Sequence, residues 1–140
     1  MTILYRTHAT AIGGRSGSAA SDDGRLRVDL STPKAIGGDD GSATNPEQLF
    51  AAGYAACFLS AIKQVARRDG IRIANDSNVT AGVSLRPNDA DEGLTLAVTL
   101  SIDLPGLDAA TADDVVHHAH AICPYSNAVR GNIDVKLRVG

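Results

Sequence analysis

Residues 44–62, TNPEQLFAAGYAACFLSAI, decide the fold of this 140-residue chain. Two helix-start signals overlap at the beginning of the stretch. Thr44 and Glu47 can form a Thr-x-x-Glu capping box, in which Glu47 has a purely local role. Asn45 can instead cap the helix, with Pro46 at the first helical position. Both alternatives predict that a helix begins here.

The helix that follows carries very few polar side chains. Residues from Leu49 to Ile62 are apolar almost all round, and Gly70 predicts an end near Asp69. Such a helix must be buried on most sides. One layer of sheet in a domain of this size leaves part of it uncovered, so the pattern favours a homodimer. Burial under a second helix of the same chain is the alternative.

Strands are predicted on both sides of this helix, and those from residue 26 onward show alternating apolar side chains. The expected strands cover residues 3–11, 26–30, 79–85, 94–102 and 133–139, of which the third and fourth form a hairpin. A second helix is expected from about Asp108 or Thr111, and Pro124 either stops it or opens a short helix that ends at Gly131. This order of elements predicts a single α+β domain over residues 1–140.

Composition narrows the range of functions. The net charge is −3 and the Lys and Arg residues are scattered, so no basic stripe is available for nucleic acid. The start of the chain resembles no secretory signal, and the apolar run of 14 residues is too short for a bilayer span of ~20. We therefore expect no membrane partner and a cytoplasmic location. In that reducing compartment, paired cysteines are more often catalytic, redox-sensing or inert than structural disulfides.

The two cysteines are Cys57, inside the apolar helix, and Cys123, immediately before Pro124. Taken alone, Cys57 is typical of a small buried hydrophobic residue. A nucleophilic role needs an activating group, because an apolar setting raises the pKa of a thiol. Arg15, in the glycine-rich turn of residues 13–17, could stabilise a thiolate. The alternative for Arg15 is a solvated turn residue.

Cys123 lies at a predicted helix break. We expect its side chain to be more exposed and mobile there than in mid-helix, as suits a thiol that has to move to form a disulfide. Nearby, His117, His118 and His120 could suggest a metal site. Their spacing places them on different helix faces with no obvious acidic partner, so no metal is expected.

Two segments of the chain resemble the organic hydroperoxide resistance proteins of the OsmC superfamily. They are residues 44–58 and Cys123-Pro124-Tyr125-Ser126-Asn127-Ala128, and the resemblance continues through residues 13–15, 104–107 and 130–135. It implies an OsmC-like α+β fold in which antiparallel sheets pack around a buried central helix. It also implies an intertwined homodimer with two active sites at the subunit interface.

The resemblance further implies a thiol-dependent peroxidase that reduces alkyl or fatty-acid hydroperoxides to alcohols. Cys57 would be the peroxidatic cysteine, which becomes a sulfenic acid, and Cys123 the resolving cysteine, which forms a disulfide with it. Arg15 would stabilise the thiolate and Glu47 would orient Arg15. No bound cofactor is implied, because the reductant would be dihydrolipoamide carried by a lipoylated protein.

Helix geometry adds one expectation of its own. Glu47 and Cys57 are ten residues apart, which is roughly 15 Å along a straight helix and places them on different faces. We therefore predict a composite site, to which a partner subunit supplies Glu47 or Arg15. The alternatives to a selective peroxidase are an OsmC-type peroxidase with a broader peroxide preference and a non-enzymatic dimer that senses redox state or binds apolar ligands.

Overall fold

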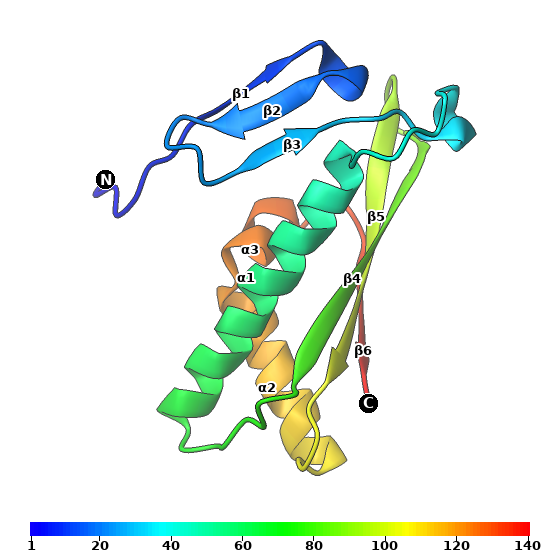
Figure 1. Cartoon of the computed structure of the whole chain (residues 1–140). Coiled ribbons are helices and arrows are strands. Elements are labelled where there is room, and N and C mark those ends of the chain that lie inside the picture. Colours follow the sequence, from blue (N-terminus) through cyan, green and yellow to red (C-terminus); the bar gives the residue numbers. More distant parts are fainter. The chain divides into compact units, whose positions relative to one another are not determined.

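The computed structural model describes residues 1–140 and consists of two compact units, Met1–Leu49 and Phe50–Gly140 (Figure 1). The first unit contains a three-stranded sheet, and the second contains another three-stranded sheet with most of the helical residues. This confirms the α+β class. The predicted single domain over residues 1–140 stays a prediction.

The sheet of the first unit is antiparallel, in the order β1 (Ala9–Ile12), β2 (Ser18–Ser21) and β3 (Arg27–Asp29). The strand predicted over residues 26–30 is confirmed as β3. The strand predicted over residues 3–11 is wrong in extent, because residues 3–8 form no regular structure. Strand β2 was missed, since its sequence Ser-Ala-Ala-Ser has no alternation of large apolar and polar side chains.

Helix α1 (Pro46–Arg68) begins as predicted, and one of the two proposed caps is present. The Asn45 Oδ1 accepts a hydrogen bond from the Gln48 backbone N–H at 2.9 Å. The Thr44 hydroxyl donates to the side-chain oxygen of Gln48 at 2.7 Å, so it takes no part in a capping box with Glu47. The carboxylate of Glu47 is therefore available for another partner.

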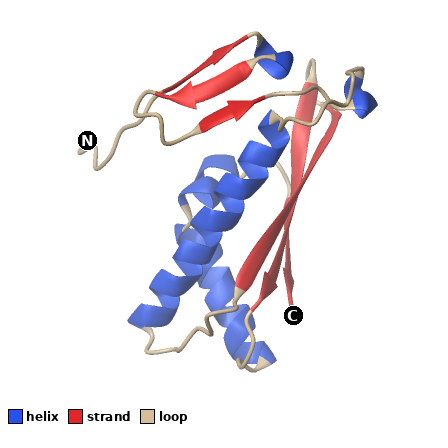
Figure 2. Cartoon of the chain, in the orientation of Figure 1, coloured by secondary structure: helices blue, strands red, loops and turns tan.

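The sheet of the second unit is mixed. Strands β4 (Asn78–Pro87) and β5 (Leu94–Asp103) form the predicted antiparallel hairpin, but β6 (Val135–Val139) pairs parallel to β5. The expectation of purely antiparallel sheets is wrong for this strand. The chain returns to the sheet through α2 (Ala109–Ile122) and α3 (Pro124–Val129), and such a helical crossover permits a parallel pair (Figure 2).

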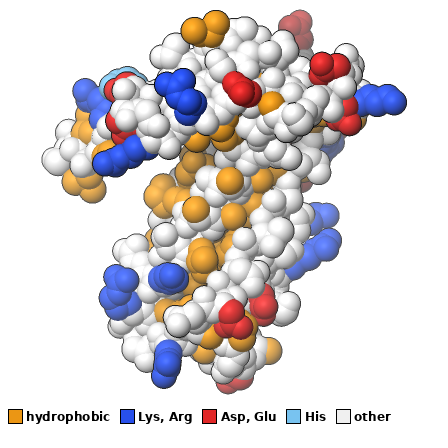
Figure 3. All heavy atoms as spheres, viewed as in Figure 1, with side chains coloured by type: hydrophobic (Ala, Val, Ile, Leu, Met, Phe, Trp, Pro, Cys, Tyr) orange, Lys and Arg blue, Asp and Glu red, His pale blue; other side chains and the backbone are white.

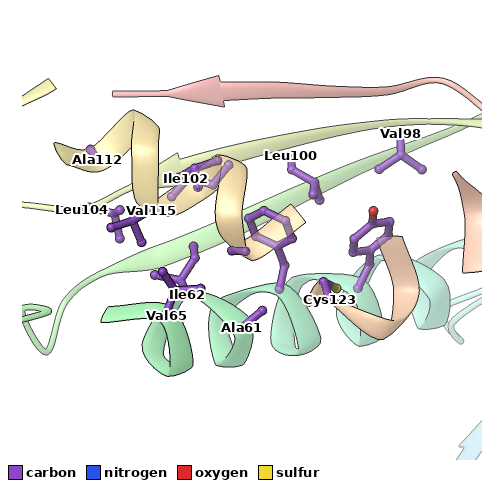
Figure 4. Packing of buried hydrophobic residues seen from close by; sticks show 14 residues of the cluster. Ala61, Ile62, Val65, Val98, Leu100, Ile102, Leu104, Ala112, Val115 and Cys123 are labelled. Carbon is purple, nitrogen blue, oxygen red and sulfur yellow. The ribbon is translucent and has the colours of Figure 1, made fainter. Parts of the chain in front are cut away.

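The core of the second unit lies between its helices and its sheet (Figure 4). Strand β5 contributes Val98, Leu100 and Ile102, and α2 contributes a buried face that includes Val115 and Val116. The buried residues of α1 are Tyr54, Phe58, Ala61, Ile62, Val65 and Ala66. Together these side chains fix α1 against the sheet and α2.

The chain does not bury α1 on most sides. Ala52 and Ala56 are exposed, and hydrophobic side chains gather over the outer face of the helix (Figure 3). Helix α1 is also long and apolar enough to cross a membrane by length and composition. This is weak support for a membrane segment, because a core helix passes the same test and one face of α1 belongs to a packed core.

Candidate active site

Arg15 lies in a short 3₁₀ turn, η1 (Gly14–Ser16), between β1 and β2. Gly13 has a φ of 78°, which side-chain-bearing residues rarely adopt. A Cβ on Gly17 would lie 1.7 Å from the carbonyl oxygen of Ile12, so only glycine lets the turn close. The turn thus holds Arg15 in a defined position.

The Arg15 guanidinium binds the Glu47 carboxylate through two hydrogen bonds. Nη1 donates to Oε2 at 2.8 Å and Nη2 donates to Oε1 at 2.6 Å. The hydrogen bond from Arg15 lowers the pKa of Glu47, and the same contact raises the pKa of Arg15. The Glu47 side chain is 16% exposed and that of Arg15 is 38% exposed, so the guanidinium also has a solvent-facing side.

Cys57 and Cys123 are both free thiols, and the second unit brings them together. Cys57 lies in the middle of α1 and is partly exposed, whereas Cys123 joins α2 to α3 and is completely buried. The expectation of a more exposed Cys123 is wrong, because the break between the helices points this side chain into the core (Figure 4).

The surroundings of Cys57 within the second unit favour the neutral thiol. Burial raises the pKa of Cys57, and interaction with the Cys123 thiol raises it further. The nearby backbone N–H of Tyr125 lowers the pKa of Cys57, but this effect is smaller than that of burial. A reactive thiolate at Cys57 therefore needs a stabilising cation.

Aromatic rings form apolar surroundings beside the cysteines. The ring of Tyr125 lies 5.9 Å from that of Phe50 and 5.6 Å from that of Tyr54, measured between centroids. A Cβ on Gly53 would lie 2.6 Å from the Tyr125 hydroxyl, so the ring packs where α1 has no side chain. The rings of Phe50 and Tyr125, which are not completely buried, can contact an apolar group that approaches Cys57.

A buried polar network next to the cysteines was not predicted from the sequence. The Ser126 hydroxyl lies 2.7 Å from the Tyr54 hydroxyl and 2.8 Å from the His120 Nδ1. Burial raises the pKa of Tyr54. The pKa of His120 is lowered, mainly by burial and to a smaller extent by the positive charge of Arg130. Ser126 belongs to the motif of residues 123–128 that carries the family resemblance, but no pattern in the sequence indicated its contacts with Tyr54 and His120.

The other two histidines of α2 face solvent. His117 lies 3.5 Å from a carboxylate oxygen of Asp113, and His118 lies 3.8 Å from one of Asp114. The expectation that these histidines lack acidic partners is therefore wrong. Neither pair is joined by a third side chain able to hold a metal ion.

The predicted site residues thus form two pairs. Arg15 and Glu47 belong to the first unit, and Cys57 and Cys123 belong to the second. Each pair supplies half of what a thiol-based reaction requires, namely a fixed cation and two adjacent thiols. Their joining into one site stays a prediction.

Known proteins resemble the chain over almost its whole length. The model of the family described as OsmC-like protein matches residues 38–138. An organic hydroperoxide resistance protein of Xanthomonas axonopodis pv. citri is 49% identical, over 96% of this chain and 94% of that protein. The organic hydroperoxide resistance protein OhrB of Bacillus subtilis is 46% identical, over 97% of this chain and 98% of that protein.

Solved structures of organic hydroperoxide resistance proteins also match the chain over almost its whole length. A crystal structure of an organic hydroperoxide resistance protein from Legionella pneumophila has a TM-score of 0.94 and 50% identity, covering 99% of both chains. The crystal structure of OhrB from Bacillus subtilis has a TM-score of 0.88 and 46% identity, covering 99% of this chain and 100% of that one.

Proposed function

This chain belongs to the OsmC-like protein family, among its organic hydroperoxide resistance proteins, and we propose that it is a thiol-dependent peroxidase that reduces organic hydroperoxides to alcohols. One observation carries the proposal. Two thiols that are 66 positions apart in the sequence lie close enough for Cys123 to raise the pKa of Cys57, and one is partly exposed while the other is buried. This is the arrangement that a peroxidatic and a resolving cysteine require.

In the first step, the Cys57 thiolate attacks one peroxide oxygen. The S–O bond forms as the O–O bond breaks, and the leaving alkoxide takes a proton to become the alcohol. Cys57 is left as a sulfenic acid. The assignment to Cys57 follows from its partial exposure, since a peroxide can reach it and cannot reach the buried Cys123 directly.

In the second step, the Cys123 sulfur attacks the sulfur of the sulfenic acid. The S–S bond forms, the S–O bond breaks, and the thiol proton leaves with the hydroxyl group as water. An external dithiol then reopens the disulfide by thiol–disulfide exchange. We infer that this reductant is dihydrolipoamide on a lipoylated protein and that the chain itself binds no cofactor.

We infer that Arg15, oriented by Glu47, supplies the cation that a Cys57 thiolate requires. The two hydrogen bonds that Arg15 donates to Glu47 hold the guanidinium in one orientation, and its partly exposed side remains free for a thiolate. We infer that each site is composite, with the bonded Arg15–Glu47 pair contributed together by the partner of a homodimer. The exposed apolar face of α1 at Ala52 and Ala56 supports such an assembly.

The apolar surroundings favour organic substrates. The rings of Phe50 and Tyr125 can pack against an alkyl tail, and each buried CH₂ contributes about 0.8 kcal/mol. Hydrogen peroxide has no tail to bury. A preference for alkyl or fatty-acid hydroperoxides over hydrogen peroxide therefore distinguishes this function from that of a peroxidase with broad preference. The need for repeated thiol reduction fits a cytoplasmic location.

The deciding experiment measures consumption of cumene hydroperoxide with dihydrolipoamide as reductant, for the native protein, Cys57→Ser and Cys123→Ser. We expect steady turnover by the native protein and none by Cys57→Ser. Cys123→Ser should consume one equivalent of peroxide per chain and then stop. Native-like turnover by both variants would refute the proposal, and an absence of turnover by the native protein would favour a sensor or an apolar ligand-binding dimer.

A further inference from the structure

One buried hydroxyl connects the three helices that surround the cysteines. The Ser126 side chain, on α3, has no solvent exposure and contacts Tyr54 of α1 and His120 of α2. A serine hydroxyl has one donor and two acceptor sites, so it can satisfy both contacts at once. Removal of the hydroxyl would leave a buried tyrosine O–H without its partner.

These contacts span the helix junction that Cys123 occupies. Cys123 is the single residue between Ile122, the end of α2, and Pro124, the start of α3. Ser126 and His120 lie three residues on either side of it and are joined across the junction. The Arg130 guanidinium closes the same junction by donating to the His120 carbonyl oxygen and to the Asn127 side chain.

The network also reaches the helix of Cys57. Tyr54 lies three residues before Cys57 on α1, so the two side chains occupy neighbouring positions on that helix. Burial raises the pKa of Tyr54, and the two thiols, Cys123 and Cys57, make smaller contributions in the same direction. One hydrogen-bonded chain therefore ties the Cys57 helix to the junction that carries Cys123.

We propose that Tyr54, Ser126 and His120 form a positioning network that holds the Cys123 sulfur against Cys57 for the disulfide-forming step. This inference rests on the proposed peroxidase function and assigns residues to its second step. In that step the sulfur of Cys123 displaces the hydroxyl of the Cys57 sulfenic acid, and the thiol proton leaves in the water produced. None of the three residues has to accept a net proton, so their contribution is geometric and electrostatic.

The network should affect the second step far more than the first. Attack on the peroxide depends on Cys57 and a stabilising cation, neither of which is hydrogen-bonded to Ser126. Disulfide formation requires two sulfur atoms to reach bonding distance, and small displacements at the reacting atoms slow such steps strongly. Loosening of the α2–α3 junction would displace only one of the two sulfurs.

The test is a single-turnover experiment with one equivalent of cumene hydroperoxide on the fully reduced chain. Peroxide loss reports the first step, and loss of two free thiols per chain reports the second. The variants are Ser126→Ala and Tyr54→Phe. Tyr54→Phe keeps the aromatic packing, so it provides the test if Ser126→Ala folds poorly. Matched controls are Ser101→Ala and Tyr5→Phe, because both side chains are exposed and distant in sequence from the network.

We expect peroxide loss in Ser126→Ala and Tyr54→Phe to stay within about twofold of native, and thiol loss to slow on the order of tenfold. Dimedone should trap the accumulated Cys57 sulfenic acid in these variants and not in the controls. If both variants lose thiols at the native rate, even with a lowered melting temperature, the positioning network is overturned and the proposed peroxidase function is not. Equal slowing of both steps would also overturn the positioning network. A native protein that consumes no peroxide would instead overturn the proposed function.

Discussion

The guanidinium of Arg15 and the carboxylate of Glu47 are joined by two hydrogen bonds, of 2.8 and 2.6 Å, across 32 positions of sequence. The arginine comes from a turn closed by glycines and the glutamate from the first turn of α1. Because Asn45 caps the helix, Glu47 is not used as a cap partner. Its carboxylate orients Arg15 instead.

Glu47→Gln should lower kcat/KM for cumene hydroperoxide by roughly ten- to a hundredfold. The amide retains the shape of the side chain but loses the charge, and one of its two polar atoms cannot accept a hydrogen bond from Arg15. Hydrogen bonds to charged groups contribute about 1.5–3 kcal/mol each, which corresponds to this range. Glu92→Gln is the matched control, since Glu92 is the only other glutamate and lies exposed in the β4–β5 turn. Equal effects of the two substitutions would contradict this prediction.

Arg15→Lys should also lower kcat/KM, despite keeping the positive charge. An ammonium group cannot make two parallel hydrogen bonds to one carboxylate, so its position relative to Cys57 is no longer fixed. The double variant with Glu47→Gln should be little worse than the worse single variant, because both changes remove the same interaction. Steady-state kinetics of the four proteins measures this coupling, and additive losses would show that the two residues act separately.

The Arg15–Glu47 pair predicts a specific pH dependence of stability. Arg15 lowers the pKa of Glu47 from 4.5, so the pair stabilises the folded state fully above about pH 4.5. This contribution is lost as the pH falls through the lower folded-state pKa. Urea unfolding of native protein and Glu47→Gln should thus give a constant difference in unfolding free energy from pH 5 to 7 and a smaller one at pH 3. Solvent screening of the exposed side of Arg15 keeps the difference small. If native protein and Glu47→Gln differ in unfolding free energy by the same amount at pH 3 and pH 7, the difference does not come from the charge of Glu47.

Limiting iodoacetamide should modify Cys57 of the reduced, folded protein well before Cys123. Cys57 is partly exposed and Cys123 has no exposed surface. Since the Cys123 thiol raises the pKa of Cys57, Cys123→Ser should shift the pH midpoint of Cys57 alkylation downward. Peptide mass spectrometry measures both effects. Comparable labelling of the two cysteines in folded protein would contradict the burial of Cys123.

Local sequence patterns determined most of the secondary structure. The start of α1, the β4–β5 hairpin, the Asp108 cap of α2 and the Pro124 start of α3 depend on neighbouring residues, so they could be predicted. The patterns failed where local preference is weak. Residues 3–8 were predicted to belong to a strand but form no strand pair, whereas β2 pairs on both sides without large apolar side chains.

The site divides in the same way. The four residues of the proposed site, Arg15, Glu47, Cys57 and Cys123, were predicted from motifs and a family resemblance, because motif residues are recognisable without their partners. Their joining into one site stays a prediction. Tertiary structure alone decided that Cys123 is buried and that Tyr54, Ser126 and His120 meet around it. It also decided that β6 runs parallel to β5. The physical reason is that burial and long-range hydrogen bonds depend on which helices and strands pack together. The spacing of residues along one element shows which of them share a face, but it does not show which other element that face contacts.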